Sequence, residues 1–169
     1  MTIALYDASI PVFKQMLSSL GHVLAKAETH ANDKKIAPDA YLQARLYPDM
    51  FPLIRQVQIA ADFAKGISAR LADVDVPAYE DNEQSFADLQ SRIKKTLEFI
   101  GSIDQSQLAG AEEREIVLRP GTPKEKKFTG SSYLLSYGLP QFFFHVTTAY
   151  GILRHNGIEI GKGDFMGLN

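Results

Sequence analysis

The stretch QFFFHVTTAYGILRHNG, residues 141–157, is the part of the chain that decides the fold. On a helical wheel, its main apolar arc contains Phe142, Val146, Ala149 and Leu153. Phe143 and Tyr150 lie on a different side, so this helix is apolar on more than one face. Such a helix lies at the centre of a fold or is shared with a second subunit. We therefore expect a central helix and a homodimer.

Three upstream segments also repeat apolar residues at steps of three and four, which is typical of helices. They run from about Leu5 to Thr29, from about Pro48 or Asp49 to Ala72, and from about Phe86 to Ile100. Pro11 either kinks the first helix or marks its true start. Four long helices with modest connections predict one all-α domain, a four-helix bundle, over residues 1–169.

The connections have recognisable turn and cap chemistry. Residues 31–35 are expected to form a loop, residues 38–46 a short helical turn, and residues 73–83 a polar connection. Ser85 is placed to cap the third helix. Asn156 and Gly157 are expected to stop the last helix, and the tail after them is short and glycine-rich.

Between the third and fourth helices the pattern changes to short extended runs. We expect strands at about Glu115–Arg119 and Lys126–Thr129, because the PGTP sequence between them is typical of a turn. The two strands would form a small inserted β-hairpin. The last helix is then expected in two pieces, about Ser132–Tyr137 and Pro140–His155, because Gly138 and Pro140 should break or bend it.

Composition excludes several classes of protein. Hydrophobic residues make up 45% of the 169 residues and charged residues 22%, which is typical of a globular domain. The net charge of −2 provides no positive field for nucleic acid or anionic lipid, and no apolar run is long enough to span a bilayer. The chain lacks cysteine and the features of a signal peptide at its start. We expect a cytoplasmic protein that binds neither nucleic acid nor membranes.

His145 is the candidate catalytic residue. It lies on the shoulder of the apolar arc, and Gln141 lies one turn earlier on the same helical face. Two histidines at this spacing would indicate a metal site, whereas one histidine with an amide is a weaker signal. His145 is therefore either a ligand or proton carrier, or a histidine that is hydrogen-bonded in the core.

The second helix contributes one further polar candidate. Its expected solvated face contains Arg55, Gln58, Asp62 and Lys65, whereas Gln56 lies at the edge of the apolar arc. A buried amide must find hydrogen-bond partners or stay near water. Tyr133 and Tyr150 could also donate hydrogen bonds to a ligand. The EDNE run at 80–83 could bind a hard cation, although it lacks the spacing of a calcium loop.

Three stretches together carry a family resemblance. They are YPDMFPLIRQVQIAADFAKG at 47–66, LQSRIKKTLEFI at 89–100, and FFFHVTTAYGILRHNG at 142–157 with its tail GKGDFMG. The chain resembles an uncharacterised family of bacterial domains of unknown function within the DinB-like (DinB/YfiT-like) superfamily, whose members are regarded as metalloenzymes. The resemblance implies a four-helix bundle of the DinB/YfiT-like type, often dimeric, with a metal site in its interior.

Metal-binding members of that superfamily carry one histidine on the second helix and an HxxxH pair on the last. His145 matches the second histidine of the pair, and Gln141 stands where the first would be. Gln56, or else Gln58, stands at the remaining position. Amide oxygen is a poorer ligand than imidazole for zinc or nickel. The resemblance therefore implies a degenerate metal site, with His145, Gln141 and Gln56 as weak candidate ligands.

Two functional hypotheses follow. The first is a dimeric protein that binds a small organic ligand, or serves interaction, with a pocket formed by Gln56, Gln141, His145 and Tyr150. The second is a metal-dependent enzyme, a thiol-dependent transferase or isomerase or a hydrolase. In that enzyme, His145 would be a ligand of zinc or nickel or a general base, and Gln56 and Gln141 would orient the substrate or water.

Overall fold

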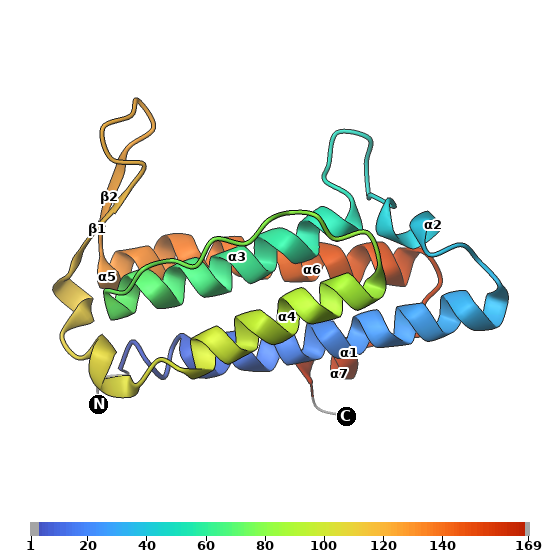
Figure 1. Cartoon of the computed structure of the whole chain (residues 1–169), viewed down its shortest axis with the longest axis horizontal. Coiled ribbons are helices and arrows are strands. Elements are labelled where there is room, and N and C mark those ends of the chain that lie inside the picture. Colours follow the sequence, from blue (N-terminus) through green and yellow to red (C-terminus); the bar gives the residue numbers. More distant parts are fainter. Residues whose placement is uncertain (1–3, 168–169) are drawn as a thin grey trace.

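The four long helices form a bundle in the computed structural model, which describes residues 4–167 (Figure 1). They are α1 (Ile10–Lys34), α3 (Leu53–Ala72), α4 (Phe86–Gly101) and α6 (Leu139–His155). α1 packs against α4, α4 against α3, and α3 most extensively against α6, which also contacts α1. The predicted all-α bundle with an inserted hairpin is confirmed.

The linker at residues 73–85 determines the direction of the helices. It runs back along the bundle from the end of α3 to the start of α4, so these two helices point the same way (Figure 1). α6 runs in the opposite direction to α3. The opposed directions of α3 and α6 decide which of their side chains meet.

The first helix differs from its predicted bounds at both ends. It begins at Ile10 with Pro11 in its first turn, so Pro11 marks the true start and causes no kink. The loop predicted at residues 31–35 is wrong, because α1 continues to Lys34 and ends where Lys35 adopts a left-handed backbone. Ala31 is fully buried. It extends the core-facing stripe by a further turn. Its burial stabilises the helix there, although the residues that follow it are polar.

The second long helix starts later than predicted. The short helix α2 (Asp39–Leu42) is followed by irregular backbone up to Pro52, and α3 begins at Leu53 instead of near Pro48. A proline disfavours helical backbone at the residue before it, so Pro52 delays the start. The cap predicted for the third helix is confirmed, because the Asp88 N–H donates to Ser85 Oγ at 3.1 Å.

The inserted hairpin consists of β1 (Glu115–Leu118) and β2 (Lys126–Thr129), which pair antiparallel. Two short 3-10 turns, η1 (Gln105–Leu108) and η2 (Ala111–Glu113), precede it. The hairpin projects from one end of the bundle (Figure 1). It therefore places its side chains beside the end of α3 and the start of the last helix.

The last helix is continuous where two pieces were predicted. One helical turn, α5 (Gly130–Ser132), leads into a π-helical segment, η3 (Tyr133–Gly138), and then directly into α6. Pro140 lies in the first turn of α6, where its missing N–H costs little. A wider π-helical turn at Tyr133–Gly138 therefore stands where the sequence predicted a break in the helix.

The tail contains a short helix that the sequence did not predict, α7 (Lys162–Met166). It docks on α1: Lys26 Nζ lies 2.6 Å from Asp164 Oδ1, and Gln15 Nε2 donates to the Met166 carbonyl at 2.8 Å. Such short helices depend on tertiary contacts, which local periodicity does not reveal. Of the helices described, none is long and apolar enough to cross a membrane.

The linker also covers the face of α3 that was predicted to be solvated. Gln58 and Lys65 are both buried, and Gln58 Nε2 donates to Glu83 Oε2 at 2.8 Å. Lys65 Nζ lies 2.9 Å from Asp62 Oδ1 and 3.8 Å from the centre of the Tyr79 ring. The prediction was wrong for these two residues, because an extended segment of the linker lies beside them where water was expected.

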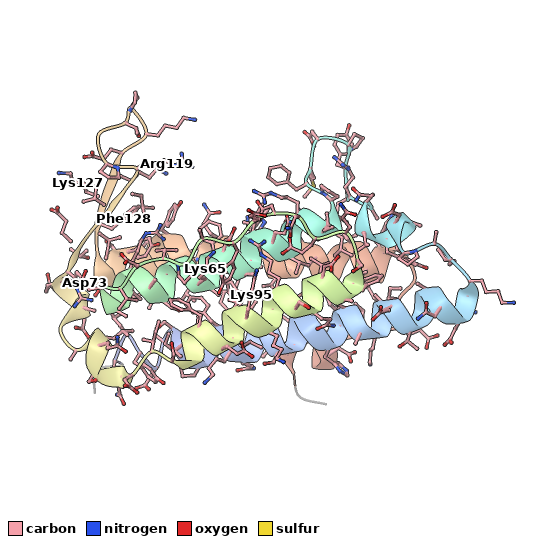
Figure 2. All side chains as sticks on the ribbon, viewed as in Figure 1. Lys65, Asp73, Lys95, Arg119, Lys127 and Phe128 are labelled. Carbon is pink, nitrogen blue, oxygen red and sulfur yellow. The ribbon has the colours of Figure 1, made fainter. Side chains whose placement is uncertain are left out.

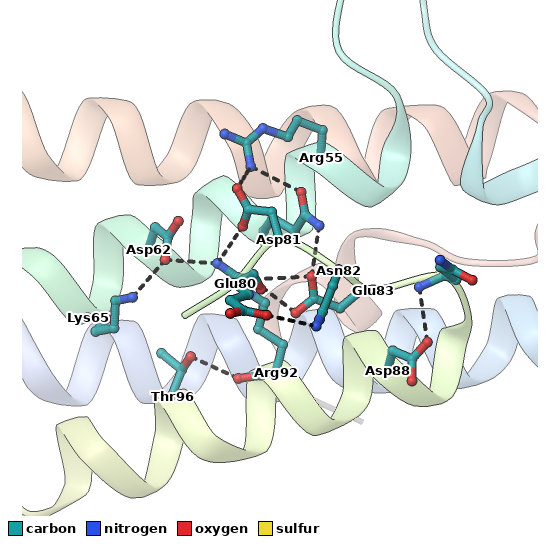
Figure 3. Close-up of polar contacts among 12 residues, drawn as sticks. Arg55, Asp62, Lys65, Glu80, Asp81, Asn82, Glu83, Asp88, Arg92 and Thr96 are labelled. Atoms are coloured by element: carbon teal, nitrogen blue, oxygen red, sulfur yellow. Dashed lines mark hydrogen bonds and ion pairs between the residues drawn. The ribbon is translucent and has the colours of Figure 1, made fainter. Parts of the chain in front are cut away.

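Arg92 of α4 holds the linker in place (Figure 3). Its side chain is 0% exposed and contacts the carboxylates of Asp62, Asp81 and Glu83 at 2.9–3.0 Å. It also donates to the Glu80 carbonyl oxygen at 3.0 Å. The acidic run at 80–83, a candidate cation site in the sequence, thus supplies the counter-charges of a buried arginine.

Candidate functional site

A seam of polar and aromatic side chains runs along the contact between α3 and the last helix. We call it the α3–α6 seam and define it by six residues: Gln56, Phe63, Arg70, Tyr133, Tyr137 and His145. The three on α3 are seven residues apart, or about two helical turns, so they share one face. Because α3 and α6 run in opposite directions, Gln56 meets His145 at one end of the seam and Arg70 meets Tyr133 at the other.

At the first end, the hydrogen bonds of Gln56 determine which ring nitrogen of His145 carries the proton. Gln56 Nε2 donates to the Phe51 carbonyl at 3.0 Å, and that oxygen can only accept. Gln56 Oε1 therefore faces His145, 2.7 Å from Nδ1. Since an amide oxygen can only accept, Nδ1 carries the proton, and Nε2 keeps its lone pair.

His145 is buried but not sealed. It is 8% exposed, and burial lowers its pKa below the ordinary value of 6.5, with the positive charge of Arg55 lowering it further. Within residues 4–167, the fully buried side-chain polar atoms without a partner are Ser68 Oγ and Arg92 Nε. His145 Nε2 is not one of them and has no hydrogen bond in that range, so water reaches it. At neutral pH this atom is an accessible hydrogen-bond acceptor.

Two aromatic rings flank this imidazole. Phe63 of α3 stacks on it, with ring centroids 5.9 Å apart and an interplanar angle of 15°. Phe144 meets it edge-on at 5.2 Å and is 55% exposed. The accessible nitrogen therefore sits among apolar surfaces, which suit the ring or chain of an organic molecule.

The other end of the seam contains a cavity of about 220 Å³. Its lining consists of Asp62, Phe63, Arg70, Leu118, Arg119, Tyr133 and Tyr137. Arg70 Nη1 donates to the Tyr133 hydroxyl at 3.2 Å, and Phe63 packs edge-on against Tyr137 at 6.1 Å. Phe63 thus belongs both to this cavity and to the surroundings of His145.

The structure brings together two of the four predicted pocket residues. Gln56 and His145 are in contact, and Gln58, the alternative to Gln56, is engaged by Glu83. Gln141 is half-buried, and in the described part of the chain it has no hydrogen bond to either residue. Tyr150 lies elsewhere and packs edge-on against Phe165 of α7, with ring centroids 5.6 Å apart.

The residues present do not fit a zinc or nickel site of the kind implied by the resemblance. The oxygen of Gln56, its one good ligand atom, accepts a hydrogen bond from His145 Nδ1, and its nitrogen donates to the Phe51 carbonyl. No three His, Cys, Asp or Glu side chains within residues 4–167 are grouped so that they could hold a metal ion. One imidazole nitrogen and the half-buried amide of Gln141 remain, which are too few ligands for a stable tetrahedral site.

Four residues of this site were not singled out from the sequence. They are Phe63, Arg70 and Tyr137 of the seam, and Arg119 of the cavity lining. The signal was present in the spacing, because Gln56, Phe63 and Arg70 repeat every seven residues, while Tyr133 and Tyr137 repeat every four. Pairing the two series requires the direction of α3 relative to α6, which the sequence does not state.

Of the six side chains that define the seam, none is a carboxylate, a serine or a threonine, and His145 is its one histidine. His145 could accept a proton or a hydrogen bond. Asp62 is the carboxylate that lines the cavity at the other end. Aromatic walls with a few fixed polar atoms are typical of small-molecule sites.

Comparison with known proteins places this chain in a family. A crystal structure of a protein described as a DinB family member from Shewanella denitrificans is similar to it, with 41% sequence identity and a TM-score of 0.91. The match covers 96% of this chain and 92% of that one. No curated protein matches the chain. The model of the family described as a domain of unknown function, DUF1993, matches residues 5–166. The chain therefore belongs to the DUF1993 family, an uncharacterised family of DinB-like helical bundles.

Proposed function

We propose that this protein binds a small organic molecule without catalysis, at the His145 end of the α3–α6 seam. The observation that supports it is the state of His145: a neutral imidazole whose proton is held on Nδ1 by Gln56, so that the accessible Nε2 accepts a hydrogen bond. Phe63 and Phe144 provide apolar surface on two sides of that atom. The ligand expected here has a hydroxyl or N–H donor beside a flat apolar group.

Phenol is a suitable probe, because it combines one O–H donor with one ring. We expect phenol to shift the NMR signals of the His145 ring and of the neighbouring amides in α3 and α6. His145→Phe keeps an aromatic ring of similar size but removes the acceptor, and it should weaken binding roughly tenfold. The matched control is His155→Phe, because His155 is exposed at the end of the same helix.

Two results would contradict this proposal. Phenol could cause no shifts up to its solubility limit, or cause shifts only away from the His145 end of the seam. Alternatively, His145→Phe could bind phenol as tightly as the wild type does. In that second case the ring contacts alone would hold phenol, and Nε2 would have no role.

We also propose a homodimer. Tyr150, one of the two residues that suggested a shared helix, packs against Phe165 in α7 of its own chain, so other side chains would have to form the dimer contact. Leu135 on η3 and Phe144 on α6 are each 55% exposed. Sedimentation should give about twice the chain mass of 18.7 kDa, and Leu135→Asp should shift it towards monomer while Ser136→Asp does not. A monomeric wild type would overturn the proposal.

A further inference from the structure

The cavity at the hairpin end of the α3–α6 seam has an unusual balance of charge. Two arginines line it, Arg70 from α3 and Arg119 from the hairpin, and no carboxylate in the described residues forms an ion pair with either. Asp62 also lines it, but its Oδ1 lies 2.9 Å from Lys65 Nζ and 3.0 Å from Arg92 Nη2. The charge of the one acidic group is therefore already balanced by Lys65 and Arg92. The two guanidinium groups have no carboxylate partner among the described residues and can bind an anion from outside the chain.

Further positive charge lies close by. Lys126 of β2 is on the same hairpin as Arg119, and its Nζ lies 5.4 Å from the centre of the Tyr137 ring, which lines the cavity. Figure 2 shows Arg119 on the hairpin that projects beside the end of the bundle. Cations from two elements thus surround one small space, and this focuses a positive potential there.

Arg70 is held in a fixed position by its own helix. Its Nη1 donates to the Gly66 carbonyl at 3.0 Å as well as to the Tyr133 hydroxyl at 3.2 Å. Gly66 makes this possible, because a Cβ at position 66 would lie 2.6 Å from Nη1. Glycine in the middle of a helix costs about 1 kcal/mol relative to alanine. Here it provides the room in which the guanidinium group lies.

Tyr133 adds a further donor. Burial raises the pKa of its phenol above the ordinary value of 10, although the charge of Arg70 lowers it, so the hydroxyl keeps its proton. The oxygen accepts from Arg70, and among residues 4–167 its own proton has no acceptor. Tyr133 and Tyr137 both lie in the π-helical segment η3. Such segments are rare and occur frequently at functional sites.

We propose that this cavity is a binding site for a small organic acid. The carboxylate would accept hydrogen bonds from Arg70, Arg119 and the Tyr133 hydroxyl. A planar guanidinium group presents paired N–H donors that match the two oxygens of a carboxylate. A flat apolar body would lie against Phe63, Leu118 and Tyr137. The volume of about 220 Å³ is sufficient for a molecule of the size of benzoate. This site uses neither His145 nor Gln56, and so goes beyond the function proposed above.

The test compares benzoate with benzamide, which has nearly the same shape but no charge. Titrations of the full chain, followed by NMR and calorimetry, should show benzoate binding at least roughly tenfold more tightly than benzamide. The shifted amides should lie around the cavity, in α3 near Arg70, in β1 near Leu118 and in η3. Inorganic phosphate should bind more weakly than benzoate, because it has no apolar body.

Variants separate the roles of the two arginines. Arg119→Gln removes an exposed charge, and Lys124→Gln is the matched control, because it removes a charge from the same hairpin outside the cavity lining. Gly66→Ala displaces the Arg70 guanidinium group without removing its charge, and it favours the helix. We expect Arg119→Gln and Gly66→Ala each to weaken benzoate binding several-fold and to leave benzamide binding unchanged. Lys124→Gln should change neither.

Several outcomes would overturn the inference. Equal affinity for benzoate and benzamide would remove the role of charge, and phosphate binding as tight as benzoate would remove the role of the apolar walls. Benzoate binding that survives both Arg119→Gln and Gly66→Ala would place the anion elsewhere. None of these results bears on phenol binding at His145, so the two proposals can fail separately.

Discussion

His145 and Gln56, which are 89 residues apart in the chain, share a hydrogen bond of 2.7 Å between Nδ1 and Oε1. The bond joins α3 to α6 inside the bundle. The Phe51 carbonyl fixes the orientation of the amide, and the amide fixes the tautomer of the ring. One backbone oxygen in a loop therefore controls which nitrogen of His145 carries the proton.

The first prediction concerns pH. Because burial and Arg55 lower the pKa of His145 in the folded state, the unfolded chain takes up its proton at a higher pH than the folded chain does. Stability from this residue is thus fully present above about pH 6.5 and is lost as the pH falls towards the folded pKa. Unfolding of wild type and His145→Gln should be measured from pH 7.5 to 5 by denaturant titration. The wild type should lose more stability than the variant.

The second prediction is that Gln56→Glu raises the pKa of His145. A carboxylate at hydrogen-bond distance favours the protonated imidazole, which opposes the effects of burial and of Arg55. An NMR titration of the His145 ring measures this directly. Gln141→Glu is the comparison. Gln141 lies on the same helix and the same helical face as His145, but within residues 4–167 it makes no hydrogen bond to His145. An equal shift in both variants would mean that Gln141 also reaches the ring.

The third prediction concerns the linker. Arg92→Met keeps much of the side-chain volume but leaves Glu83, Asp62 and Asp81 without the cation that they surround. Removing one partner of a buried ion pair typically costs about 3–5 kcal/mol. Denaturant unfolding should show a loss of this size, and exposed Lys94→Met on the same helix should stay within about 0.5 kcal/mol of the wild type. A loss below about 1 kcal/mol would mean that the network adds little net stability.

Local patterns predicted those parts of the fold whose causes are local. The Ser85 cap and the two strands around PGTP need only nearby residues, and the structure confirms both. The burial of Gln58 and Lys65 has a distant cause, the linker at 73–85, so the periodicity of α3 alone assigned them to water. The tail helix α7 is similar, because its stability comes from α1.

The candidate site shows the same division. The wheel selected Gln56, because an amide on an apolar edge needs a partner, and that partner is His145. It could not exclude Tyr150, because the residue that covers Tyr150 is Phe165 in the tail. The cavity lining combines α3, the hairpin and η3. No single stretch of sequence contains enough of it to be recognised.

The last prediction concerns metal. Because Gln56 Oε1 is committed to His145 and one imidazole nitrogen is left, we expect protein purified without an affinity tag to contain zinc and nickel far below one ion per chain. Mass spectrometry of wild type and His145→Ala measures this.

The double variant Gln56→His/Gln141→His is the positive control. It supplies a pair at the i and i+4 spacing of known zinc sites and a third imidazole across the seam. Zinc should then bind near one ion per chain. Stoichiometric zinc in the wild type that is lost in His145→Ala would contradict the prediction. It would mean that Gln56 turns its oxygen away from the ring when metal is present.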